Sequence, residues 1–539
     1  MQKLAKTIDN ILEKRVSPLS WFLNFFGIVV VRLYLDKFIA RTRSPLFDLI
    51  MDLHNLLFFF LSFALVWLVL SISLKKKPFD LSYLMLWASL AIIFPPLFDL
   101  ARTGGEVFWS FYLFSSPQEL FLQYVTIFGH LPSGIVYFGT KITFIIGILC
   151  LSAVVFIKTK KPLRTLFTAI GTYSGLFLMA AFPSLFFYLM AVIEKKNLLA
   201  VQSFEVAQFF ARTKIFGIEL ADPAYALAHN LNLIYFLLAV AFLGYFFWKS
   251  EGKIFWATLR NLRYPQIFFH SGLLFFGLGV GFLAYPENLN LDLFSALAFL
   301  VVWLSVLLAW EASVVANDLF DYRVDLISNR DRPLQTGFFT AEKYAQFGAM
   351  LFFLSFIGGM LVHYKLGILL LVYQILAWFY SAEPFRLKRF PLVASFMSAI
   401  TVLSVFFAGF ILVSPAQNLE QLAWRIVFLL LTAYTLSFPI KDFKDIEGDR
   451  KDGVRTIPVI FGEKNGRLIV GAGIFSSYIL SIFFINEMRL FWWAIMLGSI
   501  SFLVMNDQKI HPRKVFWWIL LLVTIYGFIA VKVVFELTF

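Results

Sequence analysis

Residues 294–316 read "FSALAFLVVWLSVLLAWEASVVA", and residues 317–337 follow at once as "NDLFDYRVDLISNRDRPLQTG". The first stretch is apolar over more than about 20 residues, which is the length that crosses the hydrocarbon core of a bilayer as a helix. It therefore predicts a transmembrane helix. The second stretch crowds aspartates against the end of that helix, where they repel one another unless a cation neutralises them.

The rest of the chain has the same apolar character. Of its 539 residues, 60% are hydrophobic and 19% aromatic, and the mean hydropathy is +0.80. A soluble globular chain is nearer half apolar. Ten-residue segments of alternating polarity, typical of membrane β-barrels, are absent from the sequence. The predicted fold class is an all-α polytopic membrane protein.

A basic linker at residues 249–266 separates two groups of apolar runs. Six runs precede it, near residues 20–40, 54–74, 82–100, 134–157, 164–193 and 227–248. Nine runs follow it, near residues 267–285, 293–316, 342–363, 366–381, 392–414, 422–440, 467–485, 489–506 and 515–537. We therefore predict an N-terminal multi-span domain at 1–250 and a nine-helix domain at 262–539.

Loop charges after residue 249 alternate along the chain. Loops rich in lysine and arginine, such as "SAEPFRLKR" (381–389), alternate with loops that carry few or no bases, such as "YPENLNLD" (285–292). Because basic loops stay in the cytoplasm, both aspartate-rich segments are predicted on the cytoplasmic side of the cell membrane. The basic residues of the whole chain sit in short loops between spans, so the net charge of +13 does not indicate nucleic-acid binding.

Three further features narrow the possibilities. The single cysteine, Cys150, excludes an internal disulfide and a cysteine-rich metal site. The polar start of the chain, "MQKLAKTIDNILEKRVSP", predicts an amphipathic segment on the membrane surface and not a signal peptide. The glycines of "GLGVG" (277–281) lie inside a predicted span, where small residues usually allow close helix packing.

The chain carries two acidic clusters after spans. At about 100° per residue, Asn317, Asp318, Asp321 and Asp325 are predicted to share one face of a helix. The second cluster, in "KDFKDIEGD" (441–449), places Asp442, Asp445 and Asp449 on one face as well.

Carboxylate and amide oxygens are the ligands that Mg²⁺ prefers, and nearby bases can bind phosphate oxygens. These bases are Arg332, Arg386, Lys388, Arg389 and Lys441. Acids and bases together predict a Mg²⁺-diphosphate ligand, whose organic part should be apolar because the site opens into phenylalanine-rich helices. The alternative is that these charges are solvated helix ends.

Three motifs resemble those of the UbiA superfamily of intramembrane prenyltransferases. "NDLFDYRVD" (317–325) is similar to the first motif, NDxxDxxxD, and "KDFKDIEGDRKDGVRTIPVIFG" (441–462) resembles the second. "FYSAEPFRLKRFP" (379–391) is similar to the basic loop between them. The resemblance covers residues 262–539 and leaves residues 1–250 unassigned.

The resemblance implies a helical bundle in which two Mg²⁺ ions hold a polyprenyl diphosphate while a lipophilic or aromatic acceptor attacks its first carbon. By motif position, Asn317, Asp321 and Asp325 would hold one ion, and Asp445 and Asp449 the other. Lys388 would act with these four aspartates in catalysis. The residues expected to bind substrate are Asp318, Arg332, Tyr380, Arg386, Arg389, Lys441 and Asp442.

The sequence leaves the acceptor open. An aromatic ring, a glycerol-phosphate ether lipid and a phosphoribose compound all fit, and the motifs also resemble archaeal digeranylgeranylglyceryl phosphate synthases. Glu311, inside the span before Asn317, is a candidate for orienting the acceptor, with a simple ion pair as the alternative. An ion-coupled lipid transporter is the other class of function considered. Residues 1–250 are interpreted as a scaffold, a dimerisation element or a lipid-handling module.

Overall fold

The structure is a computed structural model, and it describes residues 2–39, 48–103, 113–127 and 138–534. By the contacts within it, the chain divides into two compact units. Unit 1 comprises residues 1–215 and 219–255, and unit 2 comprises residues 216–218 and 256–539. Helix α12 (Gly252–Arg260) crosses the boundary between them.

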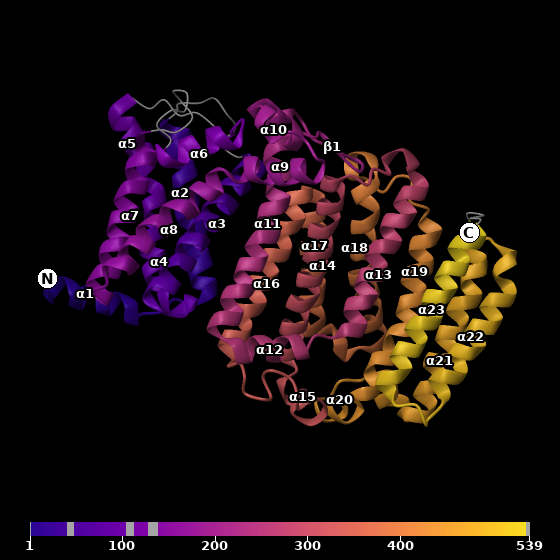
Figure 1. The fold of residues 1–539 in the computed structure, drawn as a ribbon. Helices are drawn as coiled ribbons and strands as arrows, with labels where there is room; N and C mark the ends of the chain where they lie inside the picture. Colours follow the sequence, from indigo (N-terminus) through magenta and orange to yellow (C-terminus); the bar gives the residue numbers. More distant parts are fainter. Residues whose placement is uncertain (1, 40–47, 104–112, 128–137, 535–539) are drawn as a thin grey trace. The chain divides into compact units, whose positions relative to one another are not determined.

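Unit 1 is helical apart from a two-stranded hairpin (Figure 1). Its elements are α1 (Gln2–Glu13), α2 (Pro18–Ile39), α3 (Leu49–Leu74), η1 (Pro78–Leu81), α4 (Ser82–Ser89), η2 (Leu90–Ile93), α5 (Phe94–Thr103), α6 (Pro117–Val125), α7 (Phe138–Thr159), α8 (Pro162–Ala180), α9 (Phe182–Ile193), η3 (Leu198–Ala200), α10 (Ser203–Phe210), β1 (Lys214–Ile215), β2 (Ile218–Glu219) and α11 (Pro223–Ser250). Residue Ile218 of β2 clusters with unit 2. The N-terminal segment is helical as predicted, while its place on a membrane stays a prediction.

Unit 2 contains nine long apolar helices and several short ones. Its elements are α13 (Tyr264–Ala284), η4 (Pro286–Asn288), α14 (Leu293–Phe320), α15 (Tyr322–Ser328), α16 (Ala341–Val362), α17 (Tyr364–Ser381), η5 (Leu387–Arg389), α18 (Pro391–Val413), η6 (Pro415–Gln417), α19 (Trp424–Ser437), η7 (Phe438–Lys444), α20 (Ile446–Lys451), α21 (Ile457–Ile485), η8 (Met488–Leu490), α22 (Phe491–Asn506) and α23 (Pro512–Val534).

The predicted fold class is confirmed. Among the described residues, 14 helices are long and apolar enough to cross a membrane, or 15 if one bent pair counts as a span. Nine of the 14 belong to unit 2, as predicted. The bent pair is α8 and α9, whose axes differ by 71°, so the run predicted near residues 164–193 is broken between Ala180 and Phe182.

Helix α18 is the central helix of unit 2, and 72% of the residues in its apolar stretch are buried. Its closest neighbour is α13, because glycines bring the two backbones together. A Cβ atom at Gly277 would collide with the carbonyl oxygen of Phe406, and one at Gly409 with that of Leu274. Gly277 and Gly281 of "GLGVG" thus allow close packing against α18, as their place in a span predicted, whereas Gly279 has no neighbour within 4 Å of its Cβ position.

The short helices α15 and α20 pack together at one end of unit 2 (Figure 1). Gly448 in α20 makes this contact possible, since a Cβ atom there would lie 2.6 Å from the hydroxyl of Ser328 and 2.7 Å from Val324 in α15. Each short helix belongs to one aspartate-rich segment, so their contact brings the two segments together although about 120 residues separate them in the chain.

Candidate active site

The first aspartate-rich segment turns at Asp321. Helix α14 ends at Phe320 and α15 begins at Tyr322, while Asp321 between them has φ −96° and ψ 13°. The Asp321 amide still donates to the carbonyl of Asn317 at 2.9 Å, so the turn keeps its backbone hydrogen bond. The prediction of one face on one continuous helix is therefore wrong. The carboxylates instead point to different cations, which relieves the repulsion that a shared face would impose.

The second segment is also irregular. Asp442 lies in the 3₁₀ helix η7, Asp445 follows that helix, and Asp449 lies in α20. The predicted single helical face is wrong here too, because a 3₁₀ turn has about 3 residues per turn and not about 3.6. Backbone hydrogen bonds nevertheless link Asp445 to Asp442 at 3.1 Å and Asp449 to Asp445 at 2.9 Å.

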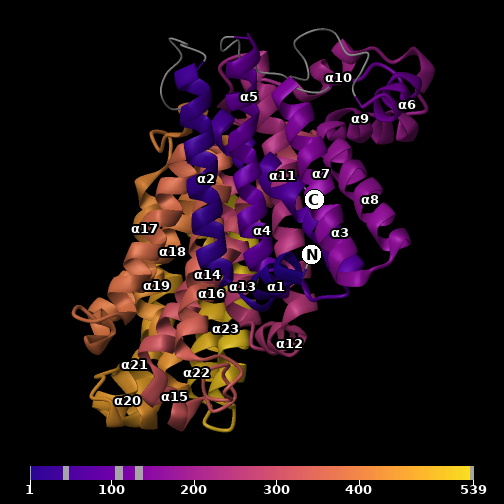
Figure 2. The same cartoon turned by 90° about the vertical axis from the view of Figure 1, so that its left-hand side faces the viewer.

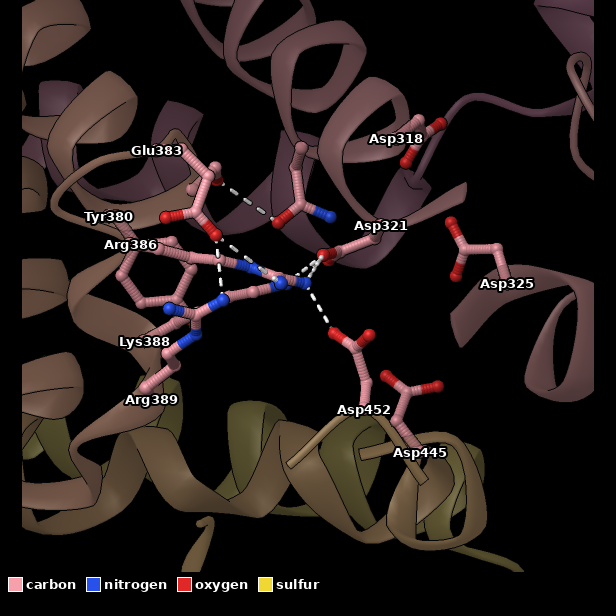
Figure 3. Close-up of polar contacts among 12 residues, drawn as sticks. Asp318, Asp321, Asp325, Tyr380, Glu383, Arg386, Lys388, Arg389, Asp445 and Asp452 are labelled. Carbon is pink, nitrogen blue, oxygen red and sulfur yellow. Dashed lines mark hydrogen bonds and ion pairs between the residues drawn. The ribbon is translucent and has the colours of Figure 1, made fainter. Parts of the chain in front are cut away.

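On one side of the site, Asp321 faces the basic loop (Figure 3). Its carboxylate accepts hydrogen bonds from Lys388 and, at 3.3 Å, from Arg386. The same guanidinium nitrogen of Arg386 donates to Asp452 at 2.5 Å. Arg386 and Lys388 are both buried, with 8% and 6% of their surfaces exposed. The basic loop therefore joins the first aspartate segment to the end of the second.

Asp318 and Asp325 lie on the other side of Asp321 from these cations (Figure 3). Arg332 pairs with both carboxylates, and its distance to Asp318 is 2.9 Å. Asp318 also pairs with Arg263, just before α13, at 2.5 Å, and accepts a hydrogen bond from Tyr344 at 3.2 Å. Both aspartates are 2% exposed. The first motif thus divides its acids between two groups of bases.

Asn329 connects the two aspartate segments directly. Its side-chain nitrogen donates to Asp325 at 3.0 Å and to Asp445 at 3.0 Å. These two carboxylates, one from each segment, therefore lie within two hydrogen bonds of each other. On its other side Asp445 has Lys444 at 3.8 Å. An amide can bridge two carboxylates in this way because its NH₂ group carries two donors.

Two further contacts bring predicted residues to the site. The amine of Lys441 donates to the hydroxyl of Tyr380 at 2.9 Å and lies 4.5 Å from the centre of its ring. Ser398 in α18 is 3.4 Å from the same amine. The side-chain oxygen of Asn317 accepts a hydrogen bond from Ser381 at 3.2 Å. The predicted residues Tyr380 and Lys441 thus form a pair beside the basic loop.

At this end of unit 2, burial disfavours the charged forms of both acids and bases. Burial, with the nearby Asp442 and Asp445, raises the pKa of Asp449 to about 8. Burial also raises the pKa of Asp325 to about 6, although Arg332 opposes the rise. For Lys388, burial lowers the pKa to about 8. A further cation near the carboxylates would favour their charged forms and lower their pKa values.

Within the described ranges, two predicted residues form no hydrogen bond or ion pair with the aspartates of the two segments. Arg389 pairs with Glu383 at 2.7 Å, and its side chain is 41% exposed. Glu311 lies in α14, and among the described residues no hydrogen-bond partner is found for its buried Oε1 atom. The roles of Arg389 at the diphosphate and of Glu311 at the acceptor therefore stay predictions.

Sequence reasoning missed several residues of the site. Asp452 could have been suspected, because it is a further acid three residues after Asp449. Asn329 and Arg263 carry no local signal, since each is recognisable only by its contact with an aspartate far away in the chain. Tyr344 likewise resembles any other aromatic residue of a span until its hydroxyl is seen to donate to Asp318.

The donor set suits Mg²⁺. In the described part of the chain, no group of three or more acidic, histidine or cysteine side chains could hold a metal ion as it stands. Mg²⁺ does not require such a cage, because it binds one or two carboxylates and completes its shell with water and phosphate oxygens. Carboxylates of both segments flank the Asn329 bridge, and oxygen is the ligand atom that this ion prefers.

Comparison with known proteins gives one consistent result. Residues 273–520 match the UbiA prenyltransferase family. The digeranylgeranylglyceryl phosphate synthase of Natronomonas pharaonis is 30% identical over 226 residues, covering 42% of this chain and 75% of that protein. The enzyme of the same name from Methanobrevibacter smithii is 26% identical over 222 residues, covering 39% and 77%. A UbiA homologue structure from Archaeoglobus fulgidus, bound to DMAPP and Mg²⁺, has a TM-score of 0.39 and 21% identity, covering 50% and 97%.

Proposed function

This chain belongs to the UbiA prenyltransferase family and is an integral membrane enzyme that transfers prenyl groups; we propose that its two aspartate segments hold a polyprenyl diphosphate through Mg²⁺. The contact of Asn329 with both Asp325 and Asp445 carries this proposal. It brings an acid of each segment within reach of one diphosphate. Because the chain belongs to a prenyltransferase family, the alternative function of an ion-coupled lipid transporter is not proposed.

The proposed metal ligands are those expected from the motifs. Asn317, Asp321 and Asp325 would hold one ion, and Asp445 and Asp449 a second. Bound Mg²⁺ would stabilise the negative charge that develops on the departing diphosphate. Its binding would also release Lys388 and Arg386 from Asp321, because the cations that now neutralise this carboxylate would no longer be needed there.

The basic residues are proposed to hold the diphosphate oxygens. Lys388, Arg386 and Lys441 approach the site from the loop and from η7, and the first two are buried enough to keep water away from their contacts. A guanidinium can bind two phosphate oxygens at once, whereas a lysine acts as a point charge. The apolar helices next to these residues would exclude water from the allylic cation.

For the acceptor, we favour a glycerol-phosphate ether lipid over an aromatic ring or a phosphoribose compound. Support comes from the relatives, which are named digeranylgeranylglyceryl phosphate synthases. Glu311 is proposed to orient the acceptor, since it is an acid inside the span that carries the first motif. Both aspartate segments would face the cytoplasm, as the basic loops of unit 2 predict.

The test is a transfer assay with protein reconstituted in nanodiscs. Labelled geranylgeranyl diphosphate and Mg²⁺ are supplied with geranylgeranylglyceryl phosphate, an aromatic acid or a phosphoribose acceptor in parallel. We expect labelled product with the glycerol-phosphate lipid. Product with only one of the other two would overturn the acceptor assignment. Absence of transfer from geranylgeranyl and shorter prenyl diphosphates, with the protein shown to be folded, would contradict the proposed donor site.

A further inference from the structure

One end of unit 1 carries a group of helices that are too short to cross a bilayer. They are α6, α9 and α10, and together with the 3₁₀ helix η3 we name them the shelf (Figure 2). The longest, α9, has 12 residues and therefore measures about 18 Å, against about 30 Å for the hydrocarbon core. Three of its elements, α9, η3 and α10, lie between the end of α8 and the start of α11 in the chain, whereas α6 precedes α7. The relation of the shelf to the membrane therefore decides how α8 and α11 connect.

The shelf is one packed body. The backbone amide of Phe114, just before α6, donates to the hydroxyl of Ser184 in α9 at 2.8 Å. Tyr188 in α9 returns a hydrogen bond to the carbonyl of Phe114 at 3.2 Å. The ring of Phe187 in α9 lies 5.5 Å from that of Phe209 in α10. These contacts join the three short helices across about 90 residues of sequence.

Helix α9 is apolar on two opposite faces. Phe187, Tyr188 and Ala191 are buried against the rest of unit 1. Leu189, Val192 and Ile193 follow the i, i+3, i+4 spacing of a helical face and are 58%, 57% and 65% exposed. A helix that is apolar all round is buried in protein or in lipid. The protein covers only one face of α9, so the second face needs an apolar partner.

The other shelf helices expose large apolar side chains as well. Phe121 and Val125 in α6 are 65% and 53% exposed, and Phe204 in α10 is 65% exposed. Leu199 in η3 is 63% exposed. An exposed apolar surface of this kind marks a protein-binding or membrane-binding surface. Two further observations bear on whether the shelf binds a protein or a membrane.

The first observation is continuity with a lipid-facing surface. Helix α8 exposes Leu163, Leu166, Phe167 and Ile170 along one stripe, and Leu178 near its end is 45% exposed. Because α8 packs against the candidate spans α3 and α7, we expect this stripe to face acyl chains. The exposed apolar residues of α9 follow this stripe in the chain, after the 71° bend.

The second observation is the polar turn that ends α9. Glu194, Lys195, Lys196 and Asn197 are all exposed, and Lys195 has φ +57° where the chain reverses. Charged side chains of this kind are costly at the bilayer centre but are accommodated at its interface. The turn thus fixes the depth of α9, because its apolar face must reach lipid while its last residues remain at the surface.

We propose that the shelf is an interfacial membrane-binding element, with Leu189, Val192, Ile193 and Phe204 inserted into one leaflet and the 194–197 turn in the headgroup layer. Helix α8 then crosses the bilayer alone, and α9 lies along its surface. Basic residues cluster where α7 meets α8, at residues 158–164, so the shelf occupies the leaflet opposite the cytoplasm.

A fluorescence experiment tests the depth of insertion. Cys150 is replaced first (Cys150→Ser), and single cysteines are introduced as Leu189→Cys, Ile193→Cys or Phe204→Cys and labelled with an environment-sensitive dye in nanodiscs. Matched controls are Lys196→Cys and Gln208→Cys, which are exposed on polar positions of the same shelf. Only variants that retain prenyl transfer are scored, so a misfolded protein is not counted.

We expect lipids with a quencher near the headgroup to abolish fluorescence at 189, 193 and 204, and aqueous iodide to abolish it at 196 and 208. Stronger quenching at 189 and 193 by a label at the acyl-chain end would overturn the proposal, because α9 would then be buried as a span. Iodide quenching at 189, 193 and 204 would equally overturn it, since that face would be in water. Protection from both quenchers would show a protein partner instead of lipid.

A second measurement tests the side of the membrane. A membrane-impermeant maleimide should label Lys196→Cys and Lys161→Cys from opposite sides of a sealed vesicle, because α8 separates them. Labelling of both from one side would show that α8 and α9 form a re-entrant pair, and the proposal would fail.

Discussion

Asp36 in α2 and Asp321 after α14 are both acids at the end of an apolar helix, but they are neutralised in different ways. Asp36 pairs with Arg32, one turn earlier on its own helix, at 3.1 Å. Asp321 pairs with Lys388 and Arg386, which come from a separate loop more than 60 residues later. The Arg32–Asp36 pair joins residues one turn apart on the same helix. The pairs of Asp321 join segments that are far apart in the chain and fix their relative positions.

The largest effect on prenyl transfer is expected from substitution of Asp321, and no comparable effect is expected from substitution of Asp36. The double substitution Asp321→Ala with Asp445→Ala removes a proposed ligand of each ion, and prenyl transfer should fall by at least about 10²–10³-fold, the loss seen when one preorganised electrostatic contact is removed. The fold should remain, with some loss of stability, because the removal of like charges is offset by the loss of a carboxylate partner for the buried Lys388. Product formation and thermal unfolding are measured together. Undiminished transfer would mean that the site lies elsewhere.

Its matched control is Arg32→Leu with Asp36→Leu in α2. Replacement of a buried ion pair by apolar residues of similar size is often neutral for stability. Turnover should therefore stay close to that of the unaltered protein. A loss as large as that of the first double variant would show that the local pair in unit 1 also serves the reaction.

Removal of divalent metal should affect the two aspartate segments of unit 2 and not the Arg32–Asp36 pair of unit 1. A chelator should stop transfer, and Mg²⁺ should restore it. A Mg²⁺-diphosphate complex at 100 times its dissociation constant should stabilise the folded protein by about 2.7 kcal/mol. The readout is the unfolding temperature with and without metal, repeated in the Asp321 and Asp445 variant. An equal stabilisation in that variant would place the metal away from these acids.

A smaller effect is expected at Asp452, which holds Arg386 in the basic loop. Asp452→Ala should raise the KM for the prenyl diphosphate by about 10-fold, equivalent to about 1.4 kcal/mol, with less change in kcat. Asp452→Glu should recover part of the loss. The control is Glu383→Ala, whose pair with Arg389 is half exposed and should contribute under about 1 kcal/mol. Equal effects at both acids would contradict a special role for Asp452.

The smallest effect on prenyl transfer should follow from Asn329→Ala, which removes the bridge between Asp325 and Asp445 and acts mainly on stability. Loss of an amide that donates to two carboxylates should lower the free energy of unfolding by about 1–3 kcal/mol. Because Mg²⁺ can still join the two segments, added Mg²⁺-diphosphate should recover most of this stability. Denaturant unfolding with and without the ligand measures both quantities. Full stability without the ligand would show that the bridge is dispensable.

Much of the architecture could be predicted from the order of residues. Nine apolar runs predicted the nine spans of unit 2, because a run of about 20 apolar residues has few other stable environments. The bend between Ala180 and Phe182 was missed, since the apolar residues continue through it without interruption. Hydropathy predicts that a segment lies in an apolar environment, but it does not predict the direction of the helix axis.

The site was predicted less completely. Asp321, Asp325, Asp445 and Lys388 follow from motif spacing, and the structure brings them to one end of unit 2. The division of the first motif between two groups of bases could not be foreseen, because it depends on the turn at Asp321 and on Arg263, which belongs to another segment. Helical periodicity assumed a straight helix where the chain turns.

The sequence alone determined that this protein is a helical membrane protein of the prenyltransferase family with two acidic segments, because apolar length and motif spacing are properties of neighbouring residues. Only the tertiary structure decided that Asn329 joins these segments, that Asp452 pairs with Arg386, and that Arg263 pairs with Asp318. It also decided that α9 turns away from α8. Those features depend on contacts between residues far apart in the chain, and such contacts exist only once the helices have packed.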